Sequence, residues 1–442
     1  MRPHFKLVGF CILAVISACA PAPQKDSASN RFTIAVIPDT QNYTDFTHQQ
    51  SAGFKLDAAD LFIQQMQYIA NNGVSNGGDI AFVASVGDVW QHQSLSIDAD
   101  HANRGIQGHQ SLSATLRAYL GPKKQTLEFE IPKAIEGYQY VSDAGIPFGV
   151  APGNHDYDAM WSVRDFEPDY SKMSKEMQGF AKAVGTLHVG GLANFKRAFG
   201  AQTSFFADKP WYVNSYNGGT SSAQIFTAGN YQFLHIAIEM QPSDEVIAWA
   251  KLVLAQYPNV PTIFSTHDYL NTQGQRLANP IVDLAAADPK GNNSPQQMWD
   301  KLFSQHDQIF LVLCGHQHGQ NRRVDANING LPVHQVLADY QDRGQVGIDA
   351  GVEINPYIGK PTGIGDGWFR LMSFDLNAEA PKISVRTYSS HYKKYSGQEP
   401  NYANWYKHIE QPQLSDAQFY AGDEFEIDLT GFHQRFKKAR QK

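Results

Sequence analysis

Side chains that commonly bind metal ions stand at five separate points of the sequence, each just after a short apolar run. They are, in chain order, Asp39 with Gln41, Asp88, Asn154 with His155, His267, and His316 with His318. Carboxylate, amide and imidazole ligands suit Mn, Fe, Zn, Ni or Mg, and no thiolate of a soft structural site accompanies them. A carboxylate among such groups can bridge two ions about 3.5–4 Å apart, which clamps the oxygens of a phosphoryl displacement. The pattern therefore predicts a dinuclear centre suited to hydrolysis.

The apolar runs before these points predict the strands that carry them. Short apolar runs bounded by Gly or Pro indicate buried strands at 32–37, 79–86, 147–151, 261–266 and 308–314. Helical periodicity alternates with them, at 56–69, 133–142, 244–255 and 295–304, and more strands follow at 333–338, 368–375 and 383–388. We therefore expect an α/β fold of two packed mixed β-sheets flanked by helices, with the strand ends collected at one edge.

Taken together, the five motifs resemble those of the calcineurin-like metallophosphoesterases. That family has Asp-x-His, Gly-Asp, Gly-Asn-His-Asp, a lone His and Gly-His-x-His in this order. Here the motifs read Asp39-Thr40-Gln41, Gly87-Asp88, Gly153-Asn154-His155-Asp156, His267 and Gly315-His316-Gln317-His318. The resemblance covers residues 32–388 outside two insertions, and it implies an αββα sandwich that hydrolyses phosphate monoesters or diesters.

The resemblance also implies a role for each residue. Two divalent metal ions are expected, the first bound by Asp39, Gln41, Asp88 and His318, and the second by Asp88, Asn154, His267 and His316. A water or hydroxide between the ions is the expected nucleophile, and His155 is expected to protonate the leaving oxygen. Asp156 is predicted to assist His155, with capping of the next turn as the alternative.

Two positions depart from related patterns. Gln41 stands where the family usually has histidine, and because an amide oxygen is a harder and weaker ligand, we expect the first ion to bind loosely or to be Mn, Fe or Mg. Gln91 stands where purple acid phosphatases carry a metal-binding tyrosine, so no tyrosinate iron centre is expected.

The N-terminal residues predict a targeting signal. A basic start, an apolar run at 7–16 and the sequence Ile16-Ser17-Ala18-Cys19 resemble the signal peptide and lipobox of bacterial lipoproteins. We expect a signal peptide over 1–18, lipidation of Cys19, and anchoring in the cell envelope, at the outer membrane facing the periplasm. A secretory peptide cut near Ala20 is the alternative.

After the signal peptide, the expected organisation is a tether over 19–30, a metallophosphoesterase domain over 31–390 and a C-terminal extension over 391–442. Insertions are expected at about 91–130 and 157–200. The remaining cysteines, Cys11 and Cys314, leave no disulfide in the mature chain, since the first is removed with the signal.

The net charge of the chain limits which binding partners are expected. The net charge is −7, from 43 acidic and 36 basic residues, which offers no general attraction for nucleic acid. A small phosphate ester is the substrate that the resemblance implies. Tyr340 and Arg343 are predicted to bind it. His92, His101 and His109 form either an additional metal site or a polar loop.

Two other functions remain open from the sequence. The chain could be a metal-binding scaffold that has lost catalysis, or a hydrolase of an envelope lipid phosphate or pyrophosphate. The second would need an apolar groove in the insertions.

Overall fold

The computed structural model describes residues 30–439 except for 95–97, 104–111, 115–116, 118–119, 164–169, 174, 289–290, 355–360, 362 and 378–379. The predicted signal peptide and the lipidation site at Cys19 lie outside these residues. Among the helices of the described part, none combines the length and apolar character needed to cross a bilayer.

Two mixed sheets of seven strands each form the centre of the molecule. The first has the order β15 (Lys394–Tyr395), β14 (Lys382–Ser389), β13 (Trp368–Asp375), β1 (Arg31–Ile37), β2 (Ile80–Ser85) and β3 (Phe148–Val150), with β16 (Phe425–Asp428) also paired to β14. The second has the order β11 (Gly319–Ala326), β12 (Pro332–Asp339), β10 (Ile309–Gly315), β9 (Thr262–Asp268), β8 (Tyr231–Ala237), β7 (Ser221–Ala228) and β6 (Tyr212–Tyr216). Within them, β1, β2 and β3 are parallel, as are β8, β9, β10 and β12.

Apolar side chains from both sheets fill the space between them. Phe32 of β1 stacks on Phe374 of β13 at 4.5 Å between ring centroids, and its ring meets Phe233 of the second sheet at 5.3 Å. Phe82 of β2 stacks on Phe226 of β7 at 4.4 Å. These contacts join the sheets face to face, as the alternation of side chains along a strand requires.

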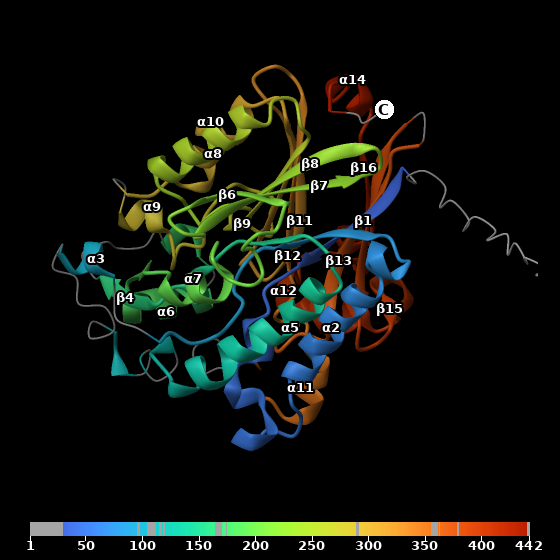
Figure 1. The fold of residues 1–442 in the computed structure, drawn as a ribbon. Coiled ribbons are helices and arrows are strands. Elements are labelled where there is room, and N and C mark those ends of the chain that lie inside the picture. Colours follow the sequence, from blue (N-terminus) through green and yellow to red (C-terminus); the bar gives the residue numbers. More distant parts are fainter. Residues whose placement is uncertain are drawn as a thin grey trace, which may run out of the picture.

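Helices cover the outer face of each sheet, with α2 (Ala59–Asn71) and α5 (Ile131–Asp143) against the first, and α8 (Asp244–Gln256) and α10 (Pro295–Lys301) against the second (Figure 1). Their starts are set locally. Ser243 accepts a hydrogen bond from the Val246 N–H at the start of α8, and Ser294 forms a capping box with Gln297 before Pro295. The predicted fold class, two packed mixed sheets flanked by helices, is confirmed.

The segment at 157–200 contains a two-stranded sheet and two helices that the sequence pattern did not predict. These are β4 (Ala159–Val163), β5 (Thr186–Gly190), α6 (Lys175–Val184) and α7 (Ala193–Phe199). Short helices occur elsewhere as α1 (Gln41–Thr44), α3 (Ala99–Asn103), α9 (Leu284–Ala287) and α11 (Gln345–Ala350). Strand β11 and helix α11 were also not predicted from the sequence.

The C-terminal residues are built into the first sheet. Strands β15 and β16 pair with β14, and α12 (Tyr402–Glu410), α13 (Asp416–Asp423) and α14 (Phe432–Arg435) accompany them. Phe432 contacts Phe233 and Phe310 of the second sheet, so the end of the described chain covers the edge of the core between the sheets.

Candidate metal centre

The parallel strands deliver the predicted ligands to one edge of the sandwich. Asp39, Asp88 and Asn154 follow β1, β2 and β3, while His267 lies near the end of β9 and His316 follows β10. Asp88, His316 and His318 have positive φ values of 52°, 72° and 38°. Non-glycine residues hold this conformation at a cost on the order of 1 kcal/mol or more, and such strain concentrates at functional sites.

Four ligand atoms converge at the centre of this edge. His267 Nε2 lies 3.2 Å from Asp88 Oδ1, 3.1 Å from Asn154 Oδ1 and 3.1 Å from His316 Nδ1. The other nitrogen of His267, Nδ1, lies 2.8 Å from the Val86 carbonyl oxygen and donates its proton there, which leaves a lone pair on Nε2. A second contact that fixes the tautomer in this way is typical of metal-binding histidines.

Asp88 Oδ1, Asn154 Oδ1 and His267 Nε2 are acceptors here, and His316 Nδ1 is a fourth when that ring carries its proton on Nε2. Acceptors this close need a proton or a cation between them. Burial would lower the pKa of His267, but Asp88 and Asp39 raise it to about 10, so that without a metal ion a proton supplies the charge. Burial and the neighbouring His267 hold the pKa of His316 well below its usual value. His316 Nε2 is buried and has no hydrogen-bond partner among the described residues. The donor set therefore fits a divalent cation.

Asp39 lies beside this cluster, completely buried. Its carboxylate accepts the backbone N–H of His316 at 3.1 and 3.3 Å, and its Oδ2 is 3.9 Å from His267 Nε2. Burial and the nearby Asp339 carboxylate raise its pKa well above the usual value. Gly315 permits this approach, because a Cβ there would come within 2.2 Å of Asp39 Oδ1.

The predicted ligands of the first ion are connected through Gln341, which the sequence had not suggested. Gln41 Nε2 donates to Asp88 Oδ2 at 3.3 Å and to Gln341 Oε1 at 2.5 Å, and Gln341 Nε2 donates to His318 Nε2 at 2.8 Å. His318 Nδ1 in turn donates to Asp342 Oδ2 at 2.7 Å. Gln41 Oε1 is buried without a partner among the described residues, so a half-turn of this amide would aim an oxygen ligand at the same place.

His155 stands at the rim of the cluster. Its backbone N–H donates to Asp88 Oδ1 at 2.9 Å, and its Nδ1 lies 2.7 Å from the Gln91 carbonyl oxygen. Its Nε2 is 4.0 Å from Asp88 Oδ2, and the side chain is 15% exposed. The ring is thus fixed by a main-chain acceptor, with Nε2 toward the cluster.

Asp156 has a different position from the one predicted. Its carboxylate accepts the backbone N–H groups of Val89 and Gly153, both at 2.8 Å, and it is fully buried. Burial and Asp88 raise its pKa to about 7. The predicted catalytic role is therefore corrected: Gln91 orients His155, and Asp156 joins the two loops that carry Asp88 and Asn154.

The predicted substrate-binding pair is also corrected. Arg343 is completely buried, forms a two-point ion pair with Glu410 at 2.8 and 2.7 Å, and meets Asp423 at 2.9 Å. Tyr340 is 1% exposed and donates to Asp423 at 2.9 Å. Neither side chain reaches solvent, so neither can meet a substrate.

His92 belongs to a buried cluster of its own. Its Nδ1 lies 2.7 Å from Glu130 Oε1 and 4.0 Å from Asp45 Oδ1, and its backbone N–H donates to Glu130 Oε2 at 2.9 Å. His109 and the side chain of His101 lie outside the described part of the chain. The ligand atoms of Asp45, His92 and Glu130 lie within 4.8 Å of one another, close enough to hold a metal ion, so His92 fits either a structural ion pair or the additional metal site.

The residues that sequence reasoning missed are Asp339, the last residue of β12, and Gln341 and Asp342 just after it. Asp339 accepts the backbone N–H of His318 at 2.8 Å and that of Gln341 at 3.1 Å. Since 333–338 was predicted as a strand, its end carried the same signal as the other five strand ends.

Comparisons with known proteins give remote similarities. No family model matches the chain. The uncharacterized protein YvnB of Bacillus subtilis is 26% identical over 256 residues, which are 57% of this chain but 15% of YvnB, so the chain spans a small part of that relative. Among solved structures, a dimetal phosphatase from Danio rerio is similar over 81% of this chain and 96% of its own, with 11% identity and a TM-score of 0.36.

Proposed function

We propose that the protein is a metal-dependent phosphoesterase with two divalent cations at this edge of the sandwich. The observation that carries the proposal is the convergence of four ligand atoms: Asp88 Oδ1, Asn154 Oδ1 and His316 Nδ1 all lie within 3.2 Å of His267 Nε2. Asp39, Gln41 and His318 border the same carboxylate and would hold the first ion, with Asp88 between the two.

When bound, the two cations would neutralise the charge of the phosphate and make water a nucleophile at neutral pH. The chain supplies the rest. Its buried ligands exclude bulk water around the cluster, and His155, oriented by the Gln91 carbonyl, presents Nε2 as the proton donor for the leaving oxygen. Rigid positioning of these groups on strand ends favours the in-line geometry.

The two ions should differ in affinity. The ligands of the second ion already face one another, whereas Gln41 must turn its amide and His318 must exchange Gln341 for the first ion. When metal is added to the empty protein, the site of the second ion, at His267 and His316, should therefore fill before the site of the first. This order supports the expectation that the ion held by Gln41 binds loosely, and the amide oxygen of Gln41 would favour Mn, Fe or Mg there.

The test is hydrolysis of bis-p-nitrophenyl phosphate and p-nitrophenyl phosphate by protein stripped of metal and refilled with Mn, Zn, Fe, Ni or Mg. Asp88→Ala should lose both turnover and metal, measured by elemental analysis. His155→Ala should lose turnover but retain two ions. A protein that binds two ions and hydrolyses neither ester with any metal would instead favour the scaffold alternative.

We further propose that the protein is lipid-anchored at Cys19 in the cell envelope, a proposal that rests on the lipobox-like sequence. Incorporation of labelled palmitate should occur in the native chain and disappear in Cys19→Ser. Equal labelling of both would contradict it.

A further inference from the structure

The side chain of Gln341 lies between two residues that would hold the first ion. Its Oε1 accepts a hydrogen bond from Gln41 Nε2 at 2.5 Å, and its Nε2 donates to His318 Nε2 at 2.8 Å. His318 Nδ1 carries its proton toward Asp342, so Nε2 holds the lone pair that a metal ion would take. An ion bound by both Gln41 and His318 must therefore lie next to the Gln341 amide.

The backbone around Gln341 is held in place, so its side chain stays beside the ion site. Its N–H donates to Asp339 Oδ1 at 3.1 Å, and the side chain is only 9% exposed. The turn also packs toward α1, because Asn42 Nδ2 donates to the Gly363 carbonyl at 2.6 Å, and a Cβ on Gly363 would come within 2.3 Å of Asp342 Cα.

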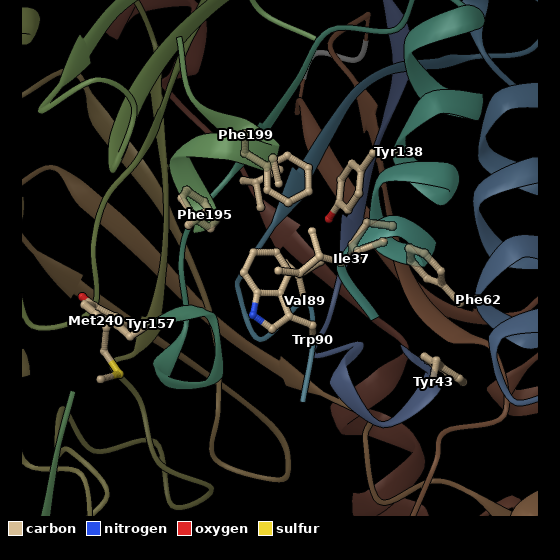
Figure 2. Packing of buried hydrophobic residues seen from close by; sticks show 14 of the residues in the cluster. Ile37, Tyr43, Phe62, Val89, Trp90, Tyr138, Tyr157, Phe195, Phe199 and Met240 are labelled. Carbon is tan, nitrogen blue, oxygen red and sulfur yellow. The ribbon is translucent and has the colours of Figure 1, made fainter. Parts of the chain in front are cut away.

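Apolar packing holds the backbone of Gln41 and Asp88 as well. Tyr43 shares the short helix α1 with Gln41. Val89 and Trp90 come directly after Asp88. All three are buried in one apolar cluster, where Figure 2 shows them. Because a close-packed cluster resists backbone shifts, the first ion must be accommodated mainly by the two amide side chains.

Turning the Gln41 amide creates a place for a cation. As the side chains stand, Gln41 Nε2 faces Gln341 Oε1 at 2.5 Å and Asp88 Oδ2 at 3.3 Å. Once the amide turns to present Oε1 as a ligand, three oxygen atoms meet there, and buried oxygens this close need a cation between them. Gln341 Oε1 already faces that place. His318 joins them when Gln341 Nε2 moves off its ring, as binding of the first ion already requires.

We propose that Gln341 is an additional ligand of the first ion, through Oε1. The inference rests on the proposed function. The site then offers nitrogen from His318 alone, and oxygen from Asp39, Gln41, Asp88 and Gln341. This added oxygen compensates for the imidazole that the family usually carries where this chain has Gln41, and it extends the preference for a hard ion such as Mn²⁺.

The experiment titrates the metal-free full chain with Mn²⁺ in a calorimeter, with the binding step of the second ion as the internal reference. Gln341→Met keeps the length of the side chain but removes its oxygen, so the first-ion step should weaken by roughly tenfold or more while the second is unchanged. Gln341→Glu retains an oxygen and should bind the first ion at least as tightly as the wild type. Gln345→Met is the matched control, because the Gln345 side chain donates to Asp349 instead, and it should bind like the wild type.

An unchanged first step in Gln341→Met would overturn the inference. Tighter binding would also overturn it, since Gln341 would then block the site until an ion displaces it. Equal weakening of both steps, or a weaker first step in Gln341→Glu, would mean that the side chain supports only the fold.

Turnover of bis-p-nitrophenyl phosphate by the metal-loaded wild type, measured alongside, tests the proposed function separately. Turnover together with a normal first step in Gln341→Met means that this inference alone fails. A wild type that binds fewer than two ions overturns both the proposed function and the inference.

Discussion

Replacing Arg343 with methionine should destabilise the protein strongly, although the side chain is not at the metal centre. Arg343 makes two hydrogen bonds to Glu410, at 2.8 and 2.7 Å, and one to Asp423 at 2.9 Å, and all three side chains are 0% exposed. Methionine retains much of the length and the contact with the Tyr340 ring, which lies 4.1 Å from the guanidinium carbon. The substitution therefore removes mainly the charge and its hydrogen bonds.

The expected loss in the free energy of unfolding is about 3–5 kcal/mol, the cost of leaving a buried partner uncompensated. Asp423 keeps Arg370 at 3.3 Å, so Glu410 bears most of this cost. Even beside Arg343, burial raises the pKa of Glu410 to about 7. Above pH 7 the wild type can ionise Glu410, while the variant must keep it protonated, so the difference should grow by up to about 1.4 kcal/mol per pH unit.

The assay is urea unfolding of metal-free protein at pH 6.5 and pH 8.5, followed by tryptophan fluorescence. Lys382→Met is the matched control, because it removes an exposed pair with Glu426 on the neighbouring β14 and β16 strands and should cost less than about 1 kcal/mol. A loss for Arg343→Met no larger than that of the control would refute the reasoning. A loss that shrinks between pH 6.5 and 8.5 would refute the part assigned to Glu410.

The remaining predictions concern the metal centre and two buried titrating groups. Metal ions at 100 times their dissociation constant should stabilise the wild type by about 2.7 kcal/mol against chelator, and this gain should be lost in His267→Ala, as thermal unfolding with and without EDTA can show. Gly315→Ala should lower metal content, measured by elemental analysis, because the added methyl would meet Asp39. Burial would lower the pKa of His92, but Glu130 raises it above the usual value. The ion pair should therefore stabilise the protein fully below about pH 6.5, and this stabilisation should fade as the pH rises. Glu130→Gln should remove this pH dependence of the free energy of unfolding, measured at pH 6 and 9. Burial raises the pKa of Asp366 to about 7, so stability should fall as the pH rises from 4 to 7, and Asp366→Asn should flatten that slope in the same assay.

The sequence predicted well which side chains meet at this edge of the sandwich, because each ligand follows a strand that is apolar on both faces. In β10, all seven residues are buried, and the run ends at Gly315 where the chain turns. Parallel strands bring such ends together whatever the loops do, so the meeting of Asp39, Asp88, Asn154 and His267 required only the strand order. Periodicity also indicated α2, α5 and α8 correctly.

Arg343 illustrates what the sequence could not reveal. A cation near a strand end resembles a phosphate-binding group, and its true partners, Glu410 and Asp423, lie 67 and 80 residues further along the chain. No local pattern links them. The same limit hid Gln341 as the connection between Gln41 and His318, since it depends on how two sheets meet and not on either strand alone.

Through the Arg343 network, the C-terminal residues also position ligands of the metal centre. Glu410 and Asp423 end α12 and α13, and through Arg343 they hold the turn that contains Gln341 and Asp342. Those two residues contact His318, and Gln341 contacts Gln41, so two predicted ligands of the first ion depend on a segment that sequence reasoning described only as an extension. In Arg343→Met, the affinity of the first ion should therefore fall while the second, held by His267 and His316, is retained. Titration of metal-free protein with Mn²⁺ would then show one of two binding steps weakened, whereas equal weakening of both would mean that the network supports only the fold.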